Sequence, residues 1–253
     1  MQRPHKPLID PALRKKSIYL LPNLFTTAAL FAGFYAIVQA MNDHFEYSAI
    51  AIFVAMVLDG IDGRVARMTH TQSPFGAEYD SLSDMVSFGV APALVVYAWA
   101  LQGMGKLGWI AAFIFCACAA LRLARFNTQL DVAEKRWFQG LPSPSAAAVV
   151  AGLVWVGVEF DYKGVDVAWL AWGVTLFAGL SMVSNIPYYS FKEVNMRKSI
   201  PFVVLLLLTL GFALLTYKPA VVLFLFFVTY LLSGYVMALM SWIKKRRAHA
   251  ESQ

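Results

Sequence analysis

VLDGIDGRVARMTHTQSPFGAEYDSLSDMVSFG, residues 57–89, places four aspartates between two strongly apolar runs. These aspartates are Asp59, Asp62, Asp80 and Asp84. A carboxylate near the core of a bilayer is costly, and such residues usually mark a functional site. The regular spacing of the four therefore makes this stretch the first place to look for chemistry.

The remainder of the chain is unusually apolar. Of its 253 residues, 59% are hydrophobic and 14% are charged, whereas a soluble domain has about 45–50% apolar and about 25% charged residues. This composition excludes an ordinary soluble domain and predicts an all-α, polytopic membrane helix bundle. Apolar runs long enough to span a bilayer predict about eight transmembrane helices, at 20–42, 47–68, 81–102, 107–127, 142–159, 166–184, 199–216 and 219–243.

We expect one transmembrane catalytic domain, residues 20–243, with its motif at 59–84. A basic segment, 1–19, precedes it and a basic tail, 244–253, follows it. If both termini are cytoplasmic, 18 of the 21 Lys and Arg residues lie on that side of the membrane. The positive-inside rule then places both termini and the motif in the cytoplasm. Because these charges flank membrane spans, they favour anionic lipid headgroups over nucleic acid as a partner.

The localisation follows from the same features. No secretory signal peptide is apparent, and the first apolar run is long enough to be a retained helix. A compact chain without a targeting peptide, with its motif on the cytoplasmic side, predicts a prokaryotic inner membrane protein.

The spacing of the aspartates predicts that they converge. On the first helix, the positions i, i+3, i+4 and i+7 of one face are Asp59, Asp62, Gly63 and Ala66. Asp80 and Asp84 share a face of the next helix, since they are four residues apart. Antiparallel packing across the short connection would bring all four carboxylates together, where they need neutralising. Carboxylate oxygens suit Mg²⁺ or Mn²⁺, and two such ions can neutralise a diphosphate and orient its reacting oxygens.

The residues between the aspartates fit a phosphate-bearing ligand. Gly60, Gly63 and Ala66 have no side chain or a small one, so a ligand can approach the helix backbone closely. Arg67 adds a forked cation suited to phosphate. A single aspartate could be explained by an ion pair with Arg64 or Arg67, or by a position near a helix N-terminus, where negative charge is favoured. These explanations do not account for four aspartates at this spacing.

The pattern Asp59-x2-Asp62-Gly63-x2-Ala66-Arg67-x8-Gly76-x3-Asp80-x3-Asp84 resembles the complete signature of the CDP-alcohol phosphatidyltransferases. The resemblance implies an all-helical membrane enzyme, usually a homodimer, with a divalent-metal site facing the cytoplasm. Such an enzyme moves a phosphatidyl group from a CDP-linked lipid to an alcohol and releases CMP. The resemblance also implies that the four aspartates hold the metals and that Asp84 is the general base. It assigns CDP binding to Gly63, Ala66, Arg67 and Gly76.

Three further stretches bear on which alcohol is accepted. DSLSDMVSFGVAPA, residues 80–93, resembles the branch of the family whose acceptor is L-serine, and LPNLFTTAALFAGF (21–34) and GLPSPSAAA (140–148) are looser matches. The resemblance therefore implies CDP-diacylglycerol and L-serine as substrates and phosphatidylserine and CMP as products. It makes Ser87, in the Ser-Phe-Gly after the last aspartate, a candidate substrate-binding residue. Glycerol phosphate or inositol is the alternative acceptor.

Other polar residues near the expected cytoplasmic edge have more than one interpretation. Arg122 and Arg125 can hold the carboxylate of serine, hold the lipid diphosphate, or simply set the topology. Asn23, Thr26 and Thr27 can line the nucleotide pocket or bond to nearby backbone.

Two function classes compete with an enzyme. A transporter that uses carboxylates as a proton or cation relay would place them near the bilayer midplane, often on repeated halves. A membrane scaffold would need no such spacing. Here the carboxylates cluster at one edge, and the sequence shows no matching second cluster.

Overall fold

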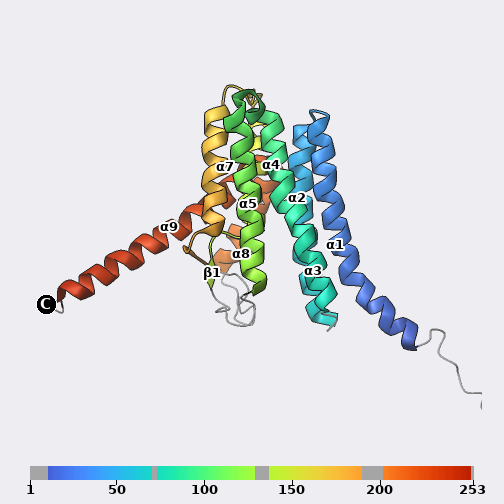
Figure 1. Ribbon diagram of the computed structural model, residues 1–253. Coiled ribbons are helices and arrows are strands. Elements are labelled where there is room, and N and C mark those ends of the chain that lie inside the picture. Colours follow the sequence, from blue (N-terminus) through green and yellow to red (C-terminus); the bar gives the residue numbers. More distant parts are fainter. Residues whose placement is uncertain (1–10, 70–72, 129–136, 190–201, 252–253) are drawn as a thin grey trace, which may run out of the picture.

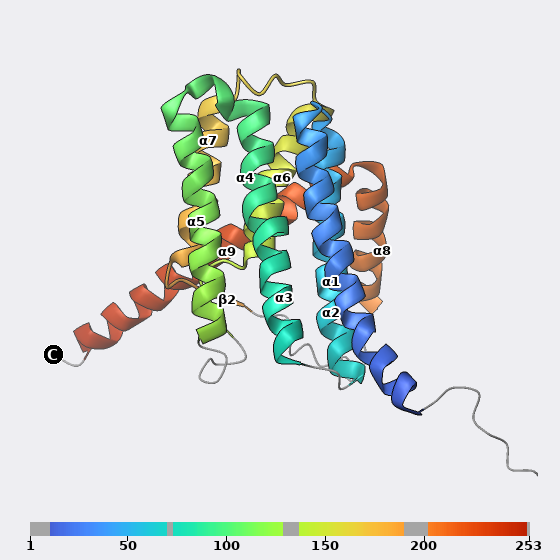
Figure 2. The ribbon, with the colours of Figure 1, turned by 45° about the vertical axis from the view of Figure 1, so that its right-hand side comes forward.

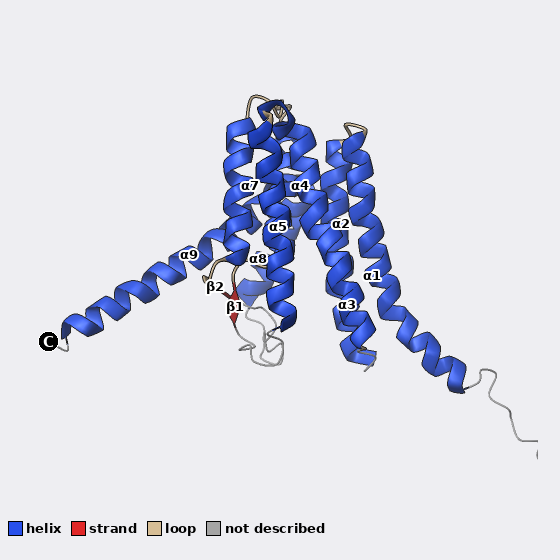
Figure 3. Ribbon diagram, viewed as in Figure 1, coloured by secondary structure: helices blue, strands red, loops and turns tan. Residues whose placement is uncertain are grey.

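The computed structural model describes residues 11–69, 73–128, 137–189 and 202–251, which are almost entirely helical (Figures 1 and 3). The expected all-α class is confirmed, while residues 1–10 of the predicted basic segment lie outside the described residues. The α-helices are α1 (Pro11–Met41), α2 (Phe45–Thr69), α3 (Pro74–Asp84), α4 (Ala91–Val96), α5 (Lys106–Thr128), α6 (Ser143–Glu159), α7 (Ala168–Val183), α8 (Phe202–Tyr217) and α9 (Pro219–Glu251).

One continuous helical column runs from α3 through α4 and changes its winding on the way. Its other parts are the π-helical turns η1 (Met85–Val90) and η2 (Tyr97–Leu101) and the 3₁₀ turn η3 (Gln102–Met104). Pro92, in the first turn of α4, has no N–H to donate, and the amide of Ala91 donates five residues back to the carbonyl of Val86. π-Helical turns are frequent at functional sites, and η1 directly follows Asp84.

Helix length and charge separate the helices into two groups. Four stretches of the described residues are long and apolar enough to cross a membrane: Pro22–Met41, Pro74–Met104, Lys106–Thr128 and Pro219–Lys244. α2 has 25 residues but carries five charged side chains. α6, α7 and α8 have 16 or 17 residues. They are therefore about 24–26 Å long, which is less than the roughly 30 Å hydrocarbon core.

The short helix α6 lies at the centre of the bundle (Figure 2). It contacts α2, α4, α7 and α9, and 13 of its 17 residues are buried. A helix that is apolar on all sides belongs in a protein interior. Because neighbouring helices surround it, α6 does not have to present a full-length apolar face to lipid.

The two ends of the bundle differ in what they contain. The end of α2, the starts of α1 and α3 and the ends of α5 and α9 lie at one end, which we call the carboxylate end (Figures 1 and 2). The α1–α2 and α6–α7 turns lie at the opposite, far end. At the far end, Lys218 Nζ is 2.6 Å from Glu159 Oε1 and ties the α8–α9 turn to the end of α6.

Two short strands connect separate loops at the carboxylate end. β1 (Trp137–Gln139) follows α5, β2 (Pro187–Tyr189) follows α7, and the two pair antiparallel. Tyr188 is fully buried, and its hydroxyl donates to the carbonyl of Leu231 at 3.1 Å. A Cβ at Gly234 would lie 2.4 Å from the Tyr188 ring. The strand pair therefore also holds α9.

The start of α3 is capped. Ser73 is its N-cap and accepts a hydrogen bond from the Gly76 amide at 3.0 Å. Proline is favoured in a first helical turn, where its missing N–H needs no partner. α9 runs to Glu251 and so includes most of the predicted basic tail, 244–253.

α1 packs very closely against α3 and η1. Ser83 Oγ donates to the carbonyl of Thr26 and Ser87 Oγ to that of Ala29, each at 3.1 Å. A Cβ at Gly33 would lie 2.5 Å from Ser87 Oγ and 2.7 Å from Ser87 Cα. The absence of a side chain at Gly33 is what permits this approach.

We predict that Gly33→Ala lowers the melting temperature of the purified protein in detergent. The added methyl group must push α1 away from Ser87, and overpacking of this kind costs about 1–3 kcal/mol. The matched control is Gly173→Ala in α7, where an added Cβ meets no neighbouring atom of the described residues within 4 Å. Equal melting temperatures for the two variants would contradict the close-packing interpretation.

Candidate active site

The structure brings together the four aspartates that the sequence groups. Asp59 and Asp62 project from α2 and Asp80 from α3, and one carboxylate oxygen of each lies within 4.8 Å of the other two. Asp84 ends α3 one turn after Asp80, and its side chain is in hydrogen-bonding contact with Asp59. α1 packs against both α2 and α3, and the carboxylates of these two helices meet beside it in one acidic cluster.

The four aspartates of the cluster cannot neutralise one another, because all of them are acidic. Asp62 is only 4% exposed, and Oδ1 of Asp80 is buried with no hydrogen-bond partner among the described residues. The contact between Asp59 and Asp84 requires a shared proton or a cation, because two ionised carboxylates repel each other. An orphaned buried oxygen in a group of hard oxygen ligands is the environment that a divalent cation satisfies.

The spacing is somewhat wider than such an ion requires. Mg²⁺ binds oxygen at about 2.0–2.1 Å in octahedral geometry, so adjacent ligand oxygens are about 2.9 Å apart and opposite ones about 4.2 Å apart. The three carboxylate oxygens lie within 4.8 Å of one another, so they would have to draw closer together to share one ion. Asp59, Asp62 and Asp80 can hold a divalent cation after such a movement, with Asp84 beside them.

α1 contributes a hydroxyl group to the acidic cluster. Thr26 is buried, and its Oγ1 donates to Oδ2 of Asp62 at 2.9 Å and lies 3.2 Å from the carbonyl of Pro22. The sequence left two roles open for Thr26, lining the nucleotide pocket or bonding to nearby backbone. The backbone contact is present, and the hydrogen bond to Asp62 is a third role that the sequence did not suggest.

The neighbouring polar residues of α1 lie beside the start of α3. Thr27 Oγ1 donates to the carbonyl of Asn23 at 2.7 Å and is 2.9 Å from the Tyr79 hydroxyl. A Cβ built on Gly76 would be 3.5 Å from Asn23 Oδ1. Asn23 and Gly76, two of the predicted substrate-binding residues, are therefore neighbours.

The small residues of the motif border open space. No described atom outside the helix backbone would lie within 4 Å of a Cβ added to Gly60 or Gly63. Ala66 is partly buried. Arg67 is exposed, and its Nε donates to the carbonyl of Gly63 at 2.9 Å. This face of α2 is thus accessible to a ligand rather than covered by a described helix.

Arg122 is the arginine that faces the acidic cluster. It interacts electrostatically with Asp84 and Asp59, and its Nη1 donates to Ser143 Oγ at 2.7 Å. Ser143 lies at the first position of α6. The only sequence signal for Ser143 is its place in the loosely matching stretch at 140–148.

Arg125 and Ser87 have different surroundings. Arg125 Nη1 donates to the carbonyl of Val183 at 3.3 Å and to Oδ1 of Asn185 at 3.4 Å, which ties α5 to the connection after α7. Ser87 is fully buried and donates to the carbonyl of Ala29 in α1. The structure thus places both residues in contacts between protein segments.

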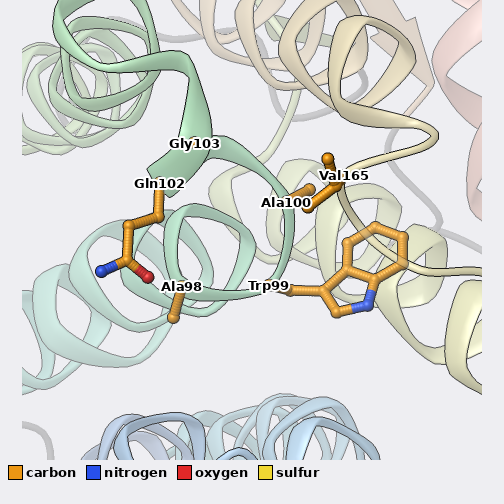
Figure 4. A pocket seen from close by; sticks show the side chains of 6 residues that line it. All are labelled: Ala98, Trp99, Ala100, Gln102, Gly103 and Val165. Carbon is orange, nitrogen blue, oxygen red and sulfur yellow. The ribbon is translucent and has the colours of Figure 1, made fainter.

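A hollow of about 290 Å³ lies at the far end of the bundle, away from the acidic cluster. Its lining is formed by Ala98, Trp99, Ala100, Gln102, Gly103 and Val165 (Figure 4). No acidic or basic side chain lines it. The titratable side chains that the sequence singles out thus lie away from this hollow.

Comparison with known proteins agrees with this geometry. Residues 19–180 match the family model described as CDP-alcohol phosphatidyltransferase. The chain is 36% identical over 227 residues to the CDP-diacylglycerol–serine O-phosphatidyltransferase of Helicobacter pylori strain J99, which covers 90% of this chain and 94% of the relative. A protein of the same name from Mycobacterium leprae is 33% identical over 224 residues, 86% of this chain and 74% of the relative.

The matched region contains both aspartate-bearing helices, Arg122 and the whole of α6. A match over this much of the sequence, with the signature aspartates brought together in space, shows that the chain is a transferase of the CDP-alcohol phosphatidyltransferase family.

Proposed function

We propose that the chain is a phosphatidylserine synthase, which converts CDP-diacylglycerol and L-serine to phosphatidylserine and CMP. The observation that carries the proposal is the acidic cluster at one end of an apolar bundle. Oxygens of three of its carboxylates lie within 4.8 Å of one another. There the acyl chains of the lipid can remain in the bilayer while its diphosphate meets the carboxylates. The printed names of the relatives support serine as the acceptor.

We propose Mg²⁺ or Mn²⁺ as the cofactor, with two ions bound by Asp59, Asp62, Asp80 and Asp84. When bound, the ions would neutralise the diphosphate and stabilise the departing phosphate oxygen. The orphaned Oδ1 of Asp80 and the Asp59–Asp84 contact support this assignment. The open face beside Gly63, Ala66 and Arg67, with Gly76 and Asn23 across from it, is proposed to receive the CDP group.

Asp84 is proposed to be the general base. It takes the proton of the serine hydroxyl, and the oxygen attacks the phosphorus that bears diacylglycerol. The new bond joins the serine oxygen to this phosphorus, and the bond from phosphorus to the bridging oxygen of CMP breaks. Asp84 is not one of the three mutually close carboxylates but touches Asp59, so it lies beside the group that is proposed to bind the ions. We favour direct attack by serine.

Arg122 is proposed to bind the carboxylate of serine. A guanidinium has five N–H donors, and the bond to Ser143 holds Arg122 beside Asp84 while leaving other donors for the substrate. Arg125 is proposed to support the site through its bonds to the α7–α8 connection. The hydroxyl of Ser87 donates to a carbonyl of α1. Ser87 is therefore proposed to support the site by holding η1 in place against α1.

The proposed setting is a prokaryotic inner membrane, with the carboxylate end and both termini in the cytoplasm. The described basic residues support this orientation: Arg64 and Arg67 lie toward the end of α2, Arg122 and Arg125 toward the end of α5, and Lys244 and Arg246 toward the end of α9. The ends of these helices lie at the carboxylate end (Figures 1 and 2). Serine would then reach the site from the cytoplasm. A homodimer is proposed from the family resemblance.

We predict that purified protein in detergent, given CDP-diacylglycerol and Mg²⁺, releases CMP much faster with L-serine than with glycerol phosphate, inositol or no acceptor. An acceptor without the matching charges leaves buried polar groups unpaired, which disfavours it. The measurement is CMP formation by chromatography. In parallel samples, chelation should stop CMP release, and added Mg²⁺ or Mn²⁺ should restore it.

Faster release with glycerol phosphate would overturn the serine assignment while leaving the aspartate chemistry intact. Full activity after exhaustive chelation would overturn the metal assignment.

Asp84→Asn is predicted to fold and insert but to lose about 10²–10⁴-fold in kcat, the usual contribution of a general base. The amide cannot take the hydroxyl proton. CMP release is measured over a range of Mg²⁺ concentrations, so that a loss of metal binding, which saturating Mg²⁺ would correct, is separated from the loss of the base. Turnover within about tenfold of the parent protein would show that Asp84 is not the base.

Arg122→Ala is predicted to raise the KM for serine more than the KM for CDP-diacylglycerol, because the serine carboxylate loses its partner. Ser143→Ala is the comparison variant: it removes the Arg122–Ser143 hydrogen bond but retains the charge, so its effect on the serine KM should be smaller. A rise confined to the lipid KM would reassign Arg122 to the diphosphate.

A further inference from the structure

Thr26 occupies an unusual position between the two helices that carry the aspartates. It lies on α1, is 4% exposed, and has two potential acceptors for one hydroxyl proton. Its Oγ1 is 2.9 Å from Oδ2 of Asp62 and 3.2 Å from the carbonyl of Pro22. A hydrogen bond to a carboxylate is stronger than one to a neutral carbonyl, so the shorter contact to Asp62 receives the proton.

The main chain of Thr26 contacts the other aspartate-bearing helix. Ser83, which is buried and directly precedes Asp84, donates from Oγ to the Thr26 carbonyl at 3.1 Å. One residue of α1 is therefore bonded to α2 through its side chain and to α3 through its backbone. A displacement of Thr26 would alter the position of Asp62 relative to Asp80 and Asp84.

We propose that Thr26 is a positioning residue that fixes the orientation of the Asp62 carboxylate for cation binding; this inference rests on the proposed metal site. An ionised carboxylate has about four acceptor positions on two oxygens. The bond from Thr26 therefore fixes the plane of the group and leaves it able to bind an ion. Groups that orient metal-binding side chains in this way typically contribute 10–100-fold to metal affinity or activity.

The chain contains a matched control for this role. Thr175 in α7 is fully buried like Thr26, and its hydroxyl donates to the carbonyl of Ala171, four residues earlier, at 2.7 Å. Thr26 has the equivalent carbonyl, that of Pro22, at 3.2 Å but donates its proton to a carboxylate. Replacing each threonine by valine removes a buried hydroxyl with little change of shape, and the two variants differ in whether a carboxylate loses its donor.

The test is direct Mn²⁺ binding to purified, metal-free protein in detergent, followed by the electron paramagnetic resonance signal of free Mn²⁺. We expect Thr26→Val to raise the Mn²⁺ dissociation constant by about tenfold or more and Thr175→Val to leave it unchanged. Thr26→Ser should restore affinity close to that of the parent protein, because it retains the hydroxyl. The Mg²⁺ concentration for half-maximal CMP release should rise in parallel with the loss of Mn²⁺ affinity.

Thr26→Ala provides a second comparison if the valine variant does not fold, since it differs from Thr26→Ser by the hydroxyl alone. Mn²⁺ affinity that is equal in these two variants, or equal in Thr26→Val and the parent protein, would overturn the role of Thr26 and leave the proposed function standing. A parent protein that binds no Mn²⁺ and remains active would instead overturn the metal site, and this inference with it.

Discussion

Mutual repulsion among the aspartates is the constraint on which the rest of the structure depends. At an effective dielectric constant of about 20, two like charges 4–5 Å apart repel by roughly 3–4 kcal/mol. Three such pairs, among Asp59, Asp62 and Asp80, approach the total net stability of a folded domain, about 5–15 kcal/mol. The cluster therefore requires positive charge, which Arg122 supplies in part and which bound cations complete in the proposed site.

The surrounding helices hold the carboxylates close together despite this repulsion. α1 packs tightly at Gly33 and donates to Asp62 through Thr26, while Ser83 of α3 and Ser87 of η1 bond to α1. From α6, Ser143 accepts a hydrogen bond from Arg122 of α5. These contacts involve several helices that are distant in the sequence, so the geometry of the acidic cluster is a property of the whole bundle.

The sequence predicted the features that depend on local spacing. Asp59 and Asp62 share one face, Asp80 and Asp84 share another, and a short connection makes their helices neighbours. The family assignment and the choice of an enzyme over a transporter or scaffold rest on the same spacing and agree with the relatives. The central position of α6 was not predictable, because an apolar run has the same composition whether lipid or protein surrounds it.

Contacts between distant segments also escaped prediction. Arg122 is bonded to a residue 21 positions away and Arg125 to residues about 60 away, and no periodic pattern encodes such pairs. The strands β1 and β2 are only three residues long, too short for an alternating pattern. Ser73 and Pro74 did carry a start signal for α3, but the same residue types are common in turns.

The π-helical turn after Asp84 separates two halves of one helical column that have different sets of neighbours. Both halves contact α1, but α4 also contacts α2, α5 and α6. One extra residue in a helix changes the direction of everything beyond it by about 100°, the rotation per residue of an α-helix. The π turn thereby offsets the angular phase of the aspartate-bearing half from that of the half that buries Val95 and Val96. The carboxylates and the buried face of α4 can therefore point in a combination of directions that an uninterrupted α-helix would not allow.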